Sequence, residues 1–511
     1  MSCSKLFSGD LPELTYEVIK YLQNDHSTLH SCILVNRLWC RLTIPLLWEN
    51  PFSISTRNCN FIIDIYLHNS KTELNEYKII NNLLPSNTLF NYLNFLKYLN
   101  TYKFITFVKK WKMSTFKNKL LKSSIIEICL LLIKIFIENE VNLHTFEIEI
   151  PRIIKDSRYL DHDILELILQ NPNFIYNIRN LKFYSIFYDV TIQNRVSQII
   201  KSHQNLKKIL LGYDLPLYQS LLLSKDYNFS NTLNTIIFYY VDLKVIINQD
   251  KVFEQFNVLE FVHIVYCSSL NNSFIQQIIT LIKPFKLRSL FINEILQIES
   301  LRLLLQKYGG YLDNFGFGFE FDFSLLLKQQ LLELITKYCK NIKFLDLYRI
   351  DNPIIYPIIN LIENIKQKLN HLTIRISDDT YYSSNGNIGY GSNILQNLGQ
   401  VLPSKLEYLS LTLSIKENDF RTFLENSQDI LINKLLIKQR GSYDILHDIK
   451  EYIMEKKRVK YLSIRYYFRD QIDLYDLKDE VEEFKLYNVR VRNWDELSFA
   501  GDIYNLLKKV D

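Results

Sequence analysis

The sequence is poor in small residues. Its 511 residues include 12 glycines and 11 prolines, both below average usage, and Ala500 is the only alanine. Enzymes that cradle phosphate groups use glycine in tight turns, because only glycine lets the backbone approach a ligand so closely. The sequence has no Walker loop, no Gly-x-Gly-x-x-Gly fingerprint and no Gly-x-Ser-x-Gly elbow. These absences count against nucleotide-binding enzymes and serine hydrolases.

The sequence also has no strong excess of charge of either sign. Its 60 Lys and Arg side chains stand against 55 Asp and Glu side chains, for a net charge of +5. Nucleic-acid-binding proteins usually carry a clear basic excess, so we expect no nucleic-acid partner. Hydrophobic residues make up 48% and aromatic residues 14% of the chain, which is enough to build a core and argues against disorder.

Long hydrophobic runs are missing as well. The first residues lack the apolar stretch of a secretory signal, and the most apolar run, 125–137, is too short to cross a membrane. We therefore expect a protein of the cytoplasm, the nucleus or both, with no membrane partner. The seven cysteines form no Cys-x-x-Cys pair and the nine histidines are scattered, so we expect no metal, no cofactor and no enzymatic activity.

A short apolar pattern recurs along most of the chain. It reads Leu-x-x-Leu-x-Leu, with Ile, Val or Phe also allowed, and most intervals between copies are 25 to 30 residues. The copies begin at Leu143, Ile178, Leu206, Leu233, Leu259, Leu287, Leu312, Ile342, Leu369, Leu406, Ile432, Val459 and, more weakly, Val481. Such regular self-similarity indicates a repeat architecture.

Each interval predicts one strand followed by one helix. The fourth and sixth positions of a copy alternate with variable ones, which is typical of a strand with one buried face. Stretches with helical spacing of apolar residues, such as 325–338 and 445–454, lie between copies. A unit this small cannot bury its own apolar face, so neighbouring units must stack. The series resembles the leucine-rich repeat, which implies a curved α/β solenoid over residues 141–490; an irregular strand and helix array of another α/β fold is the alternative.

Residues 8–52 show a second pattern. A helix-like apolar stripe follows Pro12, and a second helix is expected to begin near Ser27. The pattern resembles the F-box, a module of three helices that opens with Leu-Pro and closes with a tryptophan. The matching residues are Leu11, Pro12, Ile19, Leu22, Leu29, Val35, Arg37, Trp39, Leu42 and Trp48.

The resemblance of both parts together is to the F-box leucine-rich repeat proteins. It implies that the F-box docks on a Skp adaptor, which bridges to a cullin-RING ubiquitin ligase of the SCF type, while the repeats bind a protein substrate. All of the matching residues except Arg37 then become candidates for adaptor binding. The alternative is a leucine-rich scaffold outside any ubiquitin ligase, in which residues 10–52 only cap the repeats. Residues 53–140, with helical stretches near 76–84 and 119–139, are predicted to be a helical linker and N-terminal cap, and residues 491–511 a C-terminal cap.

The repeat register also predicts a face for binding the substrate. Side chains at the fifth and seventh positions of each copy are expected to project away from the core of the solenoid. The candidates are His263, Phe291, Gly316, Gly318, Asp346, Tyr348, Arg375, Lys438 and Arg465. Gly316 and Gly318 are expected to leave room for a partner's backbone or aromatic group. Arg375, Lys438 and Arg465 share the seventh position, where they form either a basic stripe for an acidic or phosphorylated peptide or simply a solvated face.

Overall fold

Helices and strands alternate along most of the chain. In the part that the computed structural model describes, there are 17 α-helices and 14 β-strands. The described residues are 11–23, 25–53, 60–68, 89–115, 124–150, 157–185, 189–213, 231–244, 252–292, 297–318, 324–350, 352–376, 390–440, 443–456, 458–466, 472–500, 503 and 507. The predicted helical stretch 76–84 lies outside them.

The strands pair in parallel and in chain order, from β1 to β14. Strands β2 to β13 each start within two residues of a copy of the apolar pattern, so the predicted α/β class and its repeating strands are confirmed. The strand predicted at the weak copy that begins at Val481 was wrong. Residues Lys478–Leu486 form helix α20 there, because Phe484 packs inward on helical spacing, and the short strand β14 (Arg490–Val491) comes after it.

The chain divides into two compact units, and the division falls inside a strand. Unit 1 comprises Met1–Ile236 and Gln255–Leu259, and unit 2 comprises Ile237–Glu254 and Glu260–Asp511. Strand β5 (Thr235–Tyr239) contains the boundary. The domain boundary predicted between residues 140 and 141 lies within unit 1.

Unit 1 starts with helices and continues with the first repeats. Its described elements are α2 (Pro12–Tyr21), α3 (His26–Ile33), α4 (Arg37–Trp48), η1 (Pro51–Ser53), α5 (Asn60–His68), η2 (Tyr92–Phe95), β1 (Tyr98–Asn100), α7 (Thr101–Thr115), α8 (Ile125–Glu138), β2 (Thr145–Ile150), α9 (Ser157–Leu169), η3 (Pro172–Ile175), β3 (Asn180–Ser185), α10 (Val190–Ser202), β4 (Lys208–Gly212) and the start of β5. The chain enters unit 1 again at Gln255, the last residue of η5 (Val252–Gln255). The predicted linker thus contains helices α5, α7 and α8, but also β1, the first strand of the sheet.

Helices α2, α3 and α4 form a small module with its own core. Side chains of the three helices meet in one buried cluster, which consists of Ile19, Leu29, Cys32, Trp39 and Leu46. Two of the helices start at polar caps: the side chain of Asp25 accepts from the backbone N–H of Thr28 at 3.1 Å, and that of Asn36 from Trp39 at 2.9 Å. Such caps satisfy N–H groups that the first turn of a helix leaves without a partner.

An aromatic core joins this module to the rest of unit 1. The ring of Trp48, at the end of α4, lies 5.6 Å from the ring of Tyr66 and 4.1 Å from that of Tyr92, measured between centroids. Farther along, the indole N–H of the buried Trp111 donates to Asp64 at 2.9 Å. The end of α4 is therefore packed into the helices that follow it.

A buried histidine in unit 1 makes the stability of the protein depend on pH. His203, at the end of α10, is 1% exposed, its Nε2 has no hydrogen-bond partner, and burial lowers its pKa to about 4. In the unfolded chain the imidazole takes up a proton below about pH 6.5, but in the folded protein it does so only near pH 4, so stability falls as the pH drops through this window. Between pH 7 and pH 5 we expect a loss of about 2 kcal/mol from this residue. Urea unfolding of the wild type and of His203→Leu at both pH values tests this; an equal loss in the two proteins would contradict it.

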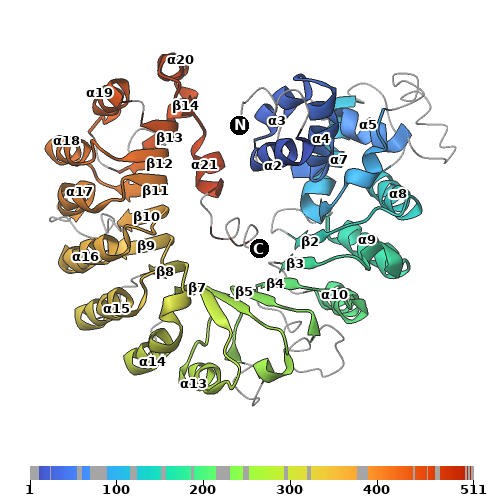
Figure 1. Ribbon diagram of the computed structural model, residues 1–511, viewed down its shortest axis with the longest axis horizontal. Helices are drawn as coiled ribbons and strands as arrows, with labels where there is room; N and C mark the ends of the chain where they lie inside the picture. Colours follow the sequence, from blue (N-terminus) through green and yellow to red (C-terminus); the bar gives the residue numbers. More distant parts are fainter. Residues whose placement is uncertain are drawn as a thin grey trace. The chain divides into compact units, whose positions relative to one another are not determined.

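Unit 2 continues the same alternation of strand and helix. After the end of β5, its elements are β6 (Phe261–Val265), α13 (Asn272–Thr280), β7 (Lys286–Ile292), α14 (Ile298–Tyr308), η6 (Gly309–Tyr311), β8 (Asn314–Gly318), α15 (Leu325–Tyr338), β9 (Phe344–Ile350), η7 (Asn352–Ile354), α16 (Ile355–Ile365), β10 (His371–Ile376), α17 (Tyr390–Val401), β11 (Lys405–Leu413), α18 (Glu417–Asn426), β12 (Leu431–Gln439), α19 (Leu446–Lys456), β13 (Val459–Tyr466), η9 (Leu474–Asp476), α20, β14 and α21 (Trp494–Ala500). Helices α13 to α19 cover one side of the strands, and the other side is the strand face of unit 2 (Figure 1).

Helix α21 lies on this strand face. Leu497 of α21 packs with Tyr408 of β11 and Leu436 of β12 in a buried cluster, and Trp494 borders the same cluster. Figure 1 shows α21 on the side of the strands opposite to helices α16 to α19. The sequence predicted that residues 491–511 would cap the end of the repeats, whereas α21 covers part of the face on which substrate binding was expected.

Candidate functional site

The pairing register arranges the side chains of the strand face of unit 2 in rows. The fifth-position row joins Phe291, Gly316, Asp346, Thr373 and Ser410 from β7 to β11. The seventh-position row joins Gly318, Tyr348, Arg375, Thr412, Lys438 and Arg465 from β8 to β13. The register therefore places the three predicted basic residues in one row, with Thr412 between the first two.

A third row was missed by sequence reasoning. The rings of Phe344, His371 and Tyr408 occupy the third position on β9, β10 and β11 and stack in sequence, with centroids 5.7 and 5.8 Å apart. The signal was present, because each of these copies carries a ring at its third position. These three rings form an aromatic row next to the predicted fifth-position row.

The two glycines do not leave room for a partner. A Cβ atom at Gly316 would lie 2.1 Å from the ring of Phe291, and one at Gly318 would lie 1.8 Å from the ring of Tyr348. The aromatic groups that approach these glycines thus belong to the neighbouring strands of the same chain. The expectation that the two glycines leave space for a partner was wrong, because the rings of Phe291 and Tyr348 occupy that space.

Two other predicted residues are part of the core. His263 is fully buried, and its Nδ1 lies 2.7 Å from the hydroxyl oxygen of Ser289 on the next strand. Phe291 is also buried, and its ring contacts those of Tyr266 and Phe344. Neither side chain presents itself to a partner in this structure.

Asp346 and Arg375 form the electrostatic centre of the face. The guanidinium Nη2 of Arg375 lies 2.6 Å from both carboxylate oxygens of Asp346, and the phenol of Tyr266 donates to the same carboxylate at 3.3 Å. Asp346 is 3% exposed, whereas 47% of the Arg375 side chain is exposed. Burial, and then the negative charge of Asp346, raise the pKa of Tyr266 well above its usual value, so the phenol stays protonated as a donor.

No protein-family model matches the sequence, and no curated protein does. Within the described residues, no group of three or more His, Cys, Asp or Glu side chains is placed to hold a metal ion, and no helix is long and apolar enough to span a membrane.

The basic row is partly neutralised at its end. Arg465 pairs with Asp473 at 3.3 Å and with Asp495 of α21 at 3.1 Å, and its guanidinium lies 5.9 Å from the ring centroid of Trp494. Burial, and then the positive charges of Arg440 and Arg465, lower the pKa of Lys438, and the negative charge of Asp495 opposes this shift.

A pocket opens where these rows meet α21. Its volume is about 510 Å³, and its walls include Arg375, Lys438 and Thr412 of the seventh-position row. Sequence reasoning missed the rest of the lining, which includes Tyr239, Tyr240, Tyr266, Tyr408, Arg440, Trp494, Ser498 and Ile503. Tyr240 and Tyr266 recur 26 residues apart with left-handed backbone, at φ 54° and 52°, a regularity that the sequence did show.

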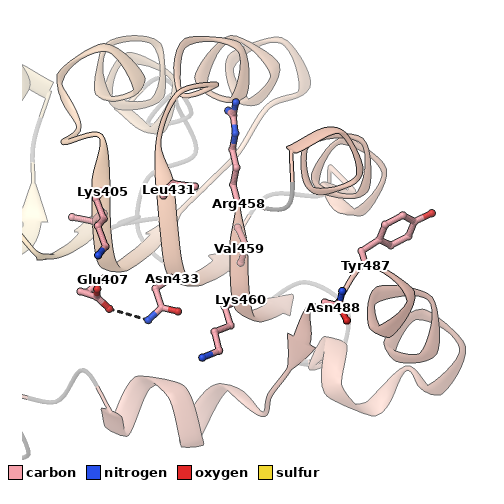
Figure 2. A pocket seen from close by; sticks show the side chains of 10 residues that line it. Lys405, Glu407, Leu431, Asn433, Arg458, Val459, Lys460, Tyr487 and Asn488 are labelled. Carbon is pink, nitrogen blue, oxygen red and sulfur yellow. Dashed lines mark hydrogen bonds between the residues drawn. The ribbon is translucent and has the colours of Figure 1, made fainter. Parts of the chain in front are cut away.

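A second depression lies at the opposite end of the strands. It has a volume of about 440 Å³ and is lined by the first residues of β11, β12 and β13 (Figure 2). The carboxylate of Glu407 accepts from the amide of Asn433 at 2.8 Å, which ties β11 to β12 within it. Its lining shares no residue with the pocket under α21.

In the N-terminal module, most of the residues predicted to bind an adaptor are structural. Ile19, Leu29, Trp39 and Trp48 are buried, while Leu11, Pro12, Leu22 and Leu42 are half-buried. Of the predicted set only Val35 is exposed, at 48%. The other large exposed hydrophobic residues of the module are Leu14, Val18, Tyr21 and Leu34.

Proposed function

We propose that this protein recruits a protein substrate to an SCF-type cullin-RING ubiquitin ligase in the cytoplasm, the nucleus or both. Residues 8–52 would act as an F-box-like module that docks on a Skp adaptor, and the leucine-rich-like repeats would bind the substrate. The chemistry of ubiquitin transfer would belong to the partners, so the chain itself needs no catalytic residues.

The exposed side of α2 is the observation that carries the proposal. The helix buries Thr15 and Ile19 in the core of the module, yet Leu14, Val18 and Tyr21 remain exposed, Tyr21 at 93%. Their spacing of four and then three residues places them on one helical face. An apolar face that the module does not cover supports docking to another protein.

The structure changes which residues should be tested. Substituting Ile19 or Leu29 removes core packing and would unfold the module whether or not an adaptor binds. Val18 and Tyr21 lie outside the buried cluster of the module, so a loss of adaptor binding on their substitution reports the interface itself.

We expect Val18→Lys together with Tyr21→Lys to weaken binding to a purified Skp adaptor by about 30-fold, since each side chain would lose roughly 1 kcal/mol of apolar contact. Isothermal titration calorimetry with the full chain measures the dissociation constant. The matched control carries Ile282→Lys and Tyr356→Lys, which alter two exposed apolar residues of unit 2. Binding that is equally strong in both variants would contradict the interface.

A second candidate function is a repeat scaffold that acts without an adaptor, with residues 10–52 as its cap. The packing of Trp48 on Tyr66 and Tyr92 favours it, because this contact fixes the end of the module to unit 1. The two functions differ in one outcome: a scaffold forms no complex between the unaltered chain and the adaptor.

A further inference from the structure

Charged side chains line the edge of the sheet of unit 2 where its strands begin. From β6 to β9 they form ion pairs, measured here between side-chain nitrogen and oxygen atoms. Lys286 pairs with Glu260 at 2.8 Å. Arg288 and Lys343 both pair with Asp313, at 2.8 and 3.1 Å. Each pair joins neighbouring repeats, so the charges at these strand starts have partners within the chain.

At the starts of β11, β13 and β14 this pairing is missing. Within the part of the chain that the structure describes, the exposed side chains of Lys405, Lys460 and Arg490 form no ion pair and no hydrogen bond. The last two lie over the ring of Tyr461, 5.3 and 5.9 Å from its centroid. The side chains of 455–457, a glutamate and two lysines, are outside the described part and carry no net negative charge. This edge therefore holds cations that can pair with an acidic partner.

Two depressions along this edge adjoin, and together they are called the edge groove here. The depression drawn in Figure 2 has a volume of about 440 Å³, and its neighbour has a volume of about 670 Å³. Lys405 and Glu407 line both of them. The second depression extends the groove to Asn370, the residue before β10. The groove thus crosses several neighbouring repeats.

Two lysines are the cations that face this groove. Figure 2 shows Lys405 and Lys460 directed to the same side of the strands as Glu407. Arg458 points to the opposite side, and its Nη1 donates to the carbonyl oxygen of Ser427 at 3.5 Å. The ammonium groups of the two lysines are therefore the ones that a ligand in the groove would meet.

The pairing register fixes the separation of these lysines. Lys405 pairs with Leu431 on β12, and the next residue of β12, Ile432, pairs with Val459 on β13. Lys460 therefore lies two strands away from Lys405 and two residues farther along. With strands about 4.8 Å apart and a rise of about 3.3 Å per residue, the two Cα atoms are about 12 Å apart. An extended peptide spans this distance in about four residues.

A peptide with two acidic side chains four positions apart matches this spacing. Alternate side chains of an extended chain point the same way, so both acids and the residue midway between them face the groove. Leu431 lies on the strand between the two lysines and is 52% exposed, so an apolar side chain at the midway position would cover it. The carboxylate of Glu407 is engaged by the amide of Asn433 at 2.8 Å and leaves both lysines available.

A nucleic-acid strand fits the groove less well. Its charge recurs at every nucleotide, whereas the groove offers two separated lysines with a leucine between them. Proteins that bind single strands present a continuous basic track and open aromatic faces on which bases stack. A short protein segment therefore suits these residues better.

We propose that the edge groove binds an extended segment of a partner protein, in which two acidic residues lie four positions apart with an apolar residue midway. Lys405 and Lys460 pair with the acids, and Leu431 contacts the apolar side chain. The site stands apart from adaptor docking. Only the role of this segment as part of a ubiquitination substrate rests on the proposed function.

The experiment titrates the full chain with blocked heptapeptides by saturation-transfer difference NMR at low ionic strength, because exposed ion pairs are screened by salt. The acidic peptide is Gly-Asp-Ser-Leu-Ser-Asp-Gly; one counterpart has asparagine for both aspartates, and another has serine for leucine. A ten-nucleotide oligothymidylate represents nucleic acid.

Two protein variants test the groove, and one serves as a control. The groove variant combines Lys405→Met with Lys460→Met, and a second variant is Leu431→Ser. The matched control combines Lys416→Met with Lys478→Met, because both lysines are exposed residues of unit 2 outside the two linings. Thermal unfolding without ligand checks that every variant is folded.

We expect the wild type and the control to bind the acidic peptide, and the groove variant to bind it about tenfold more weakly, roughly threefold for each exposed ion pair. Serine in place of the peptide's leucine should weaken binding to the wild type about threefold and leave binding to Leu431→Ser unchanged. Tighter binding of the oligonucleotide than of the acidic peptide overturns the assignment to a protein partner.

The proposal also fails if the acidic peptide binds the wild type no better than its asparagine counterpart, or if the folded groove variant binds it as tightly as the control does. These measurements contain no adaptor. Their failure is thus distinct from a failure of adaptor docking, which the variant at Val18 and Tyr21 tests.

Discussion

Replacing Gly316 with alanine is expected to destabilise the protein by about 3 kcal/mol, although alanine is usually the better residue in a strand. The new methyl group would lie 2.1 Å from Cδ1 and 2.6 Å from Cε1 of Phe291. Because the Phe291 ring is 1% exposed and contacts Tyr266 and Phe344, it cannot move aside without disturbing the core. Urea unfolding of the full chain measures the loss.

Two other glycines provide matched controls. At Gly310 a Cβ atom would meet nothing within 4 Å, so Gly310→Ala should be almost neutral. At Gly318 the clash is with the far end of the half-buried Tyr348, which can rotate, so the loss should lie between the other two. A double variant adds a test: Phe291→Leu should cost about 2 kcal/mol less in the Gly316→Ala background than in the wild type. A Gly316→Ala protein as stable as Gly310→Ala would show that this packing is not tight.

The repeat strands could be predicted because their signal is local. In each copy from Leu143 to Val459 the apolar residues that mark the strand lie within six positions of one another, and burial of one sheet face requires that spacing. The prediction of a strand at Val481 failed for the same reason, because it too rested on a local signal. Its three apolar positions also fit a helix that buries Phe484 alone and leaves Leu486 exposed. Within so short a segment, the apolar spacing does not distinguish a strand from a helix.

The face itself could be predicted only as far as its register. Counting positions placed Arg375, Lys438 and Arg465 in one row, because parallel strands of equal repeats pair position by position. The ring that covers Gly316 comes from the preceding repeat, and the ring that covers Gly318 comes from the following one. A single sequence does not tell which way those rings turn. The position of α21 depends on packing with Tyr408 and Leu436, which are far away in the chain.

The N-terminal module shows a related limit. Its three helices follow from caps and apolar spacing, but the same spacing cannot separate a residue that builds the core from one that faces a partner. Ile19 and Val18 are neighbours in the sequence and have opposite environments, one fully buried and the other 42% exposed. The resemblance pointed to the buried set because apolar core positions define the pattern.

Removing Arg375 is expected to be as damaging as the substitution at Gly316. The change Arg375→Met should cost about 3 kcal/mol, because it leaves the buried Asp346 with only the phenol of Tyr266 at 3.3 Å. The value lies at the low end for a broken buried pair, since the adjoining pocket lets water reach the carboxylate. Urea unfolding at neutral pH is again the measurement.

The opposite substitution should be much milder. In Asp346→Asn the guanidinium of Arg375 loses the negative charge and one acceptor oxygen of its partner, but 47% of that side chain is already exposed and water replaces the lost contact. We expect a cost of about 1 kcal/mol. The asymmetry follows from burial and from the acceptor that asparagine keeps, since Arg375→Met removes both hydrogen bonds whereas Asp346→Asn leaves one carbonyl oxygen to accept.

The double variant Arg375→Met with Asp346→Leu separates the pair from its surroundings. Without the buried carboxylate, methionine leaves no charge uncompensated, so the double variant should recover about 2 kcal/mol relative to Arg375→Met alone. An additive loss would mean that Arg375 stabilises unit 2 mainly through its contact with the ring of Tyr348, 5.6 Å from the guanidinium carbon, rather than through Asp346. Arg375→Lys distinguishes these contributions further, because lysine keeps the positive charge for Asp346 but lacks the planar guanidinium that stacks on an aromatic ring.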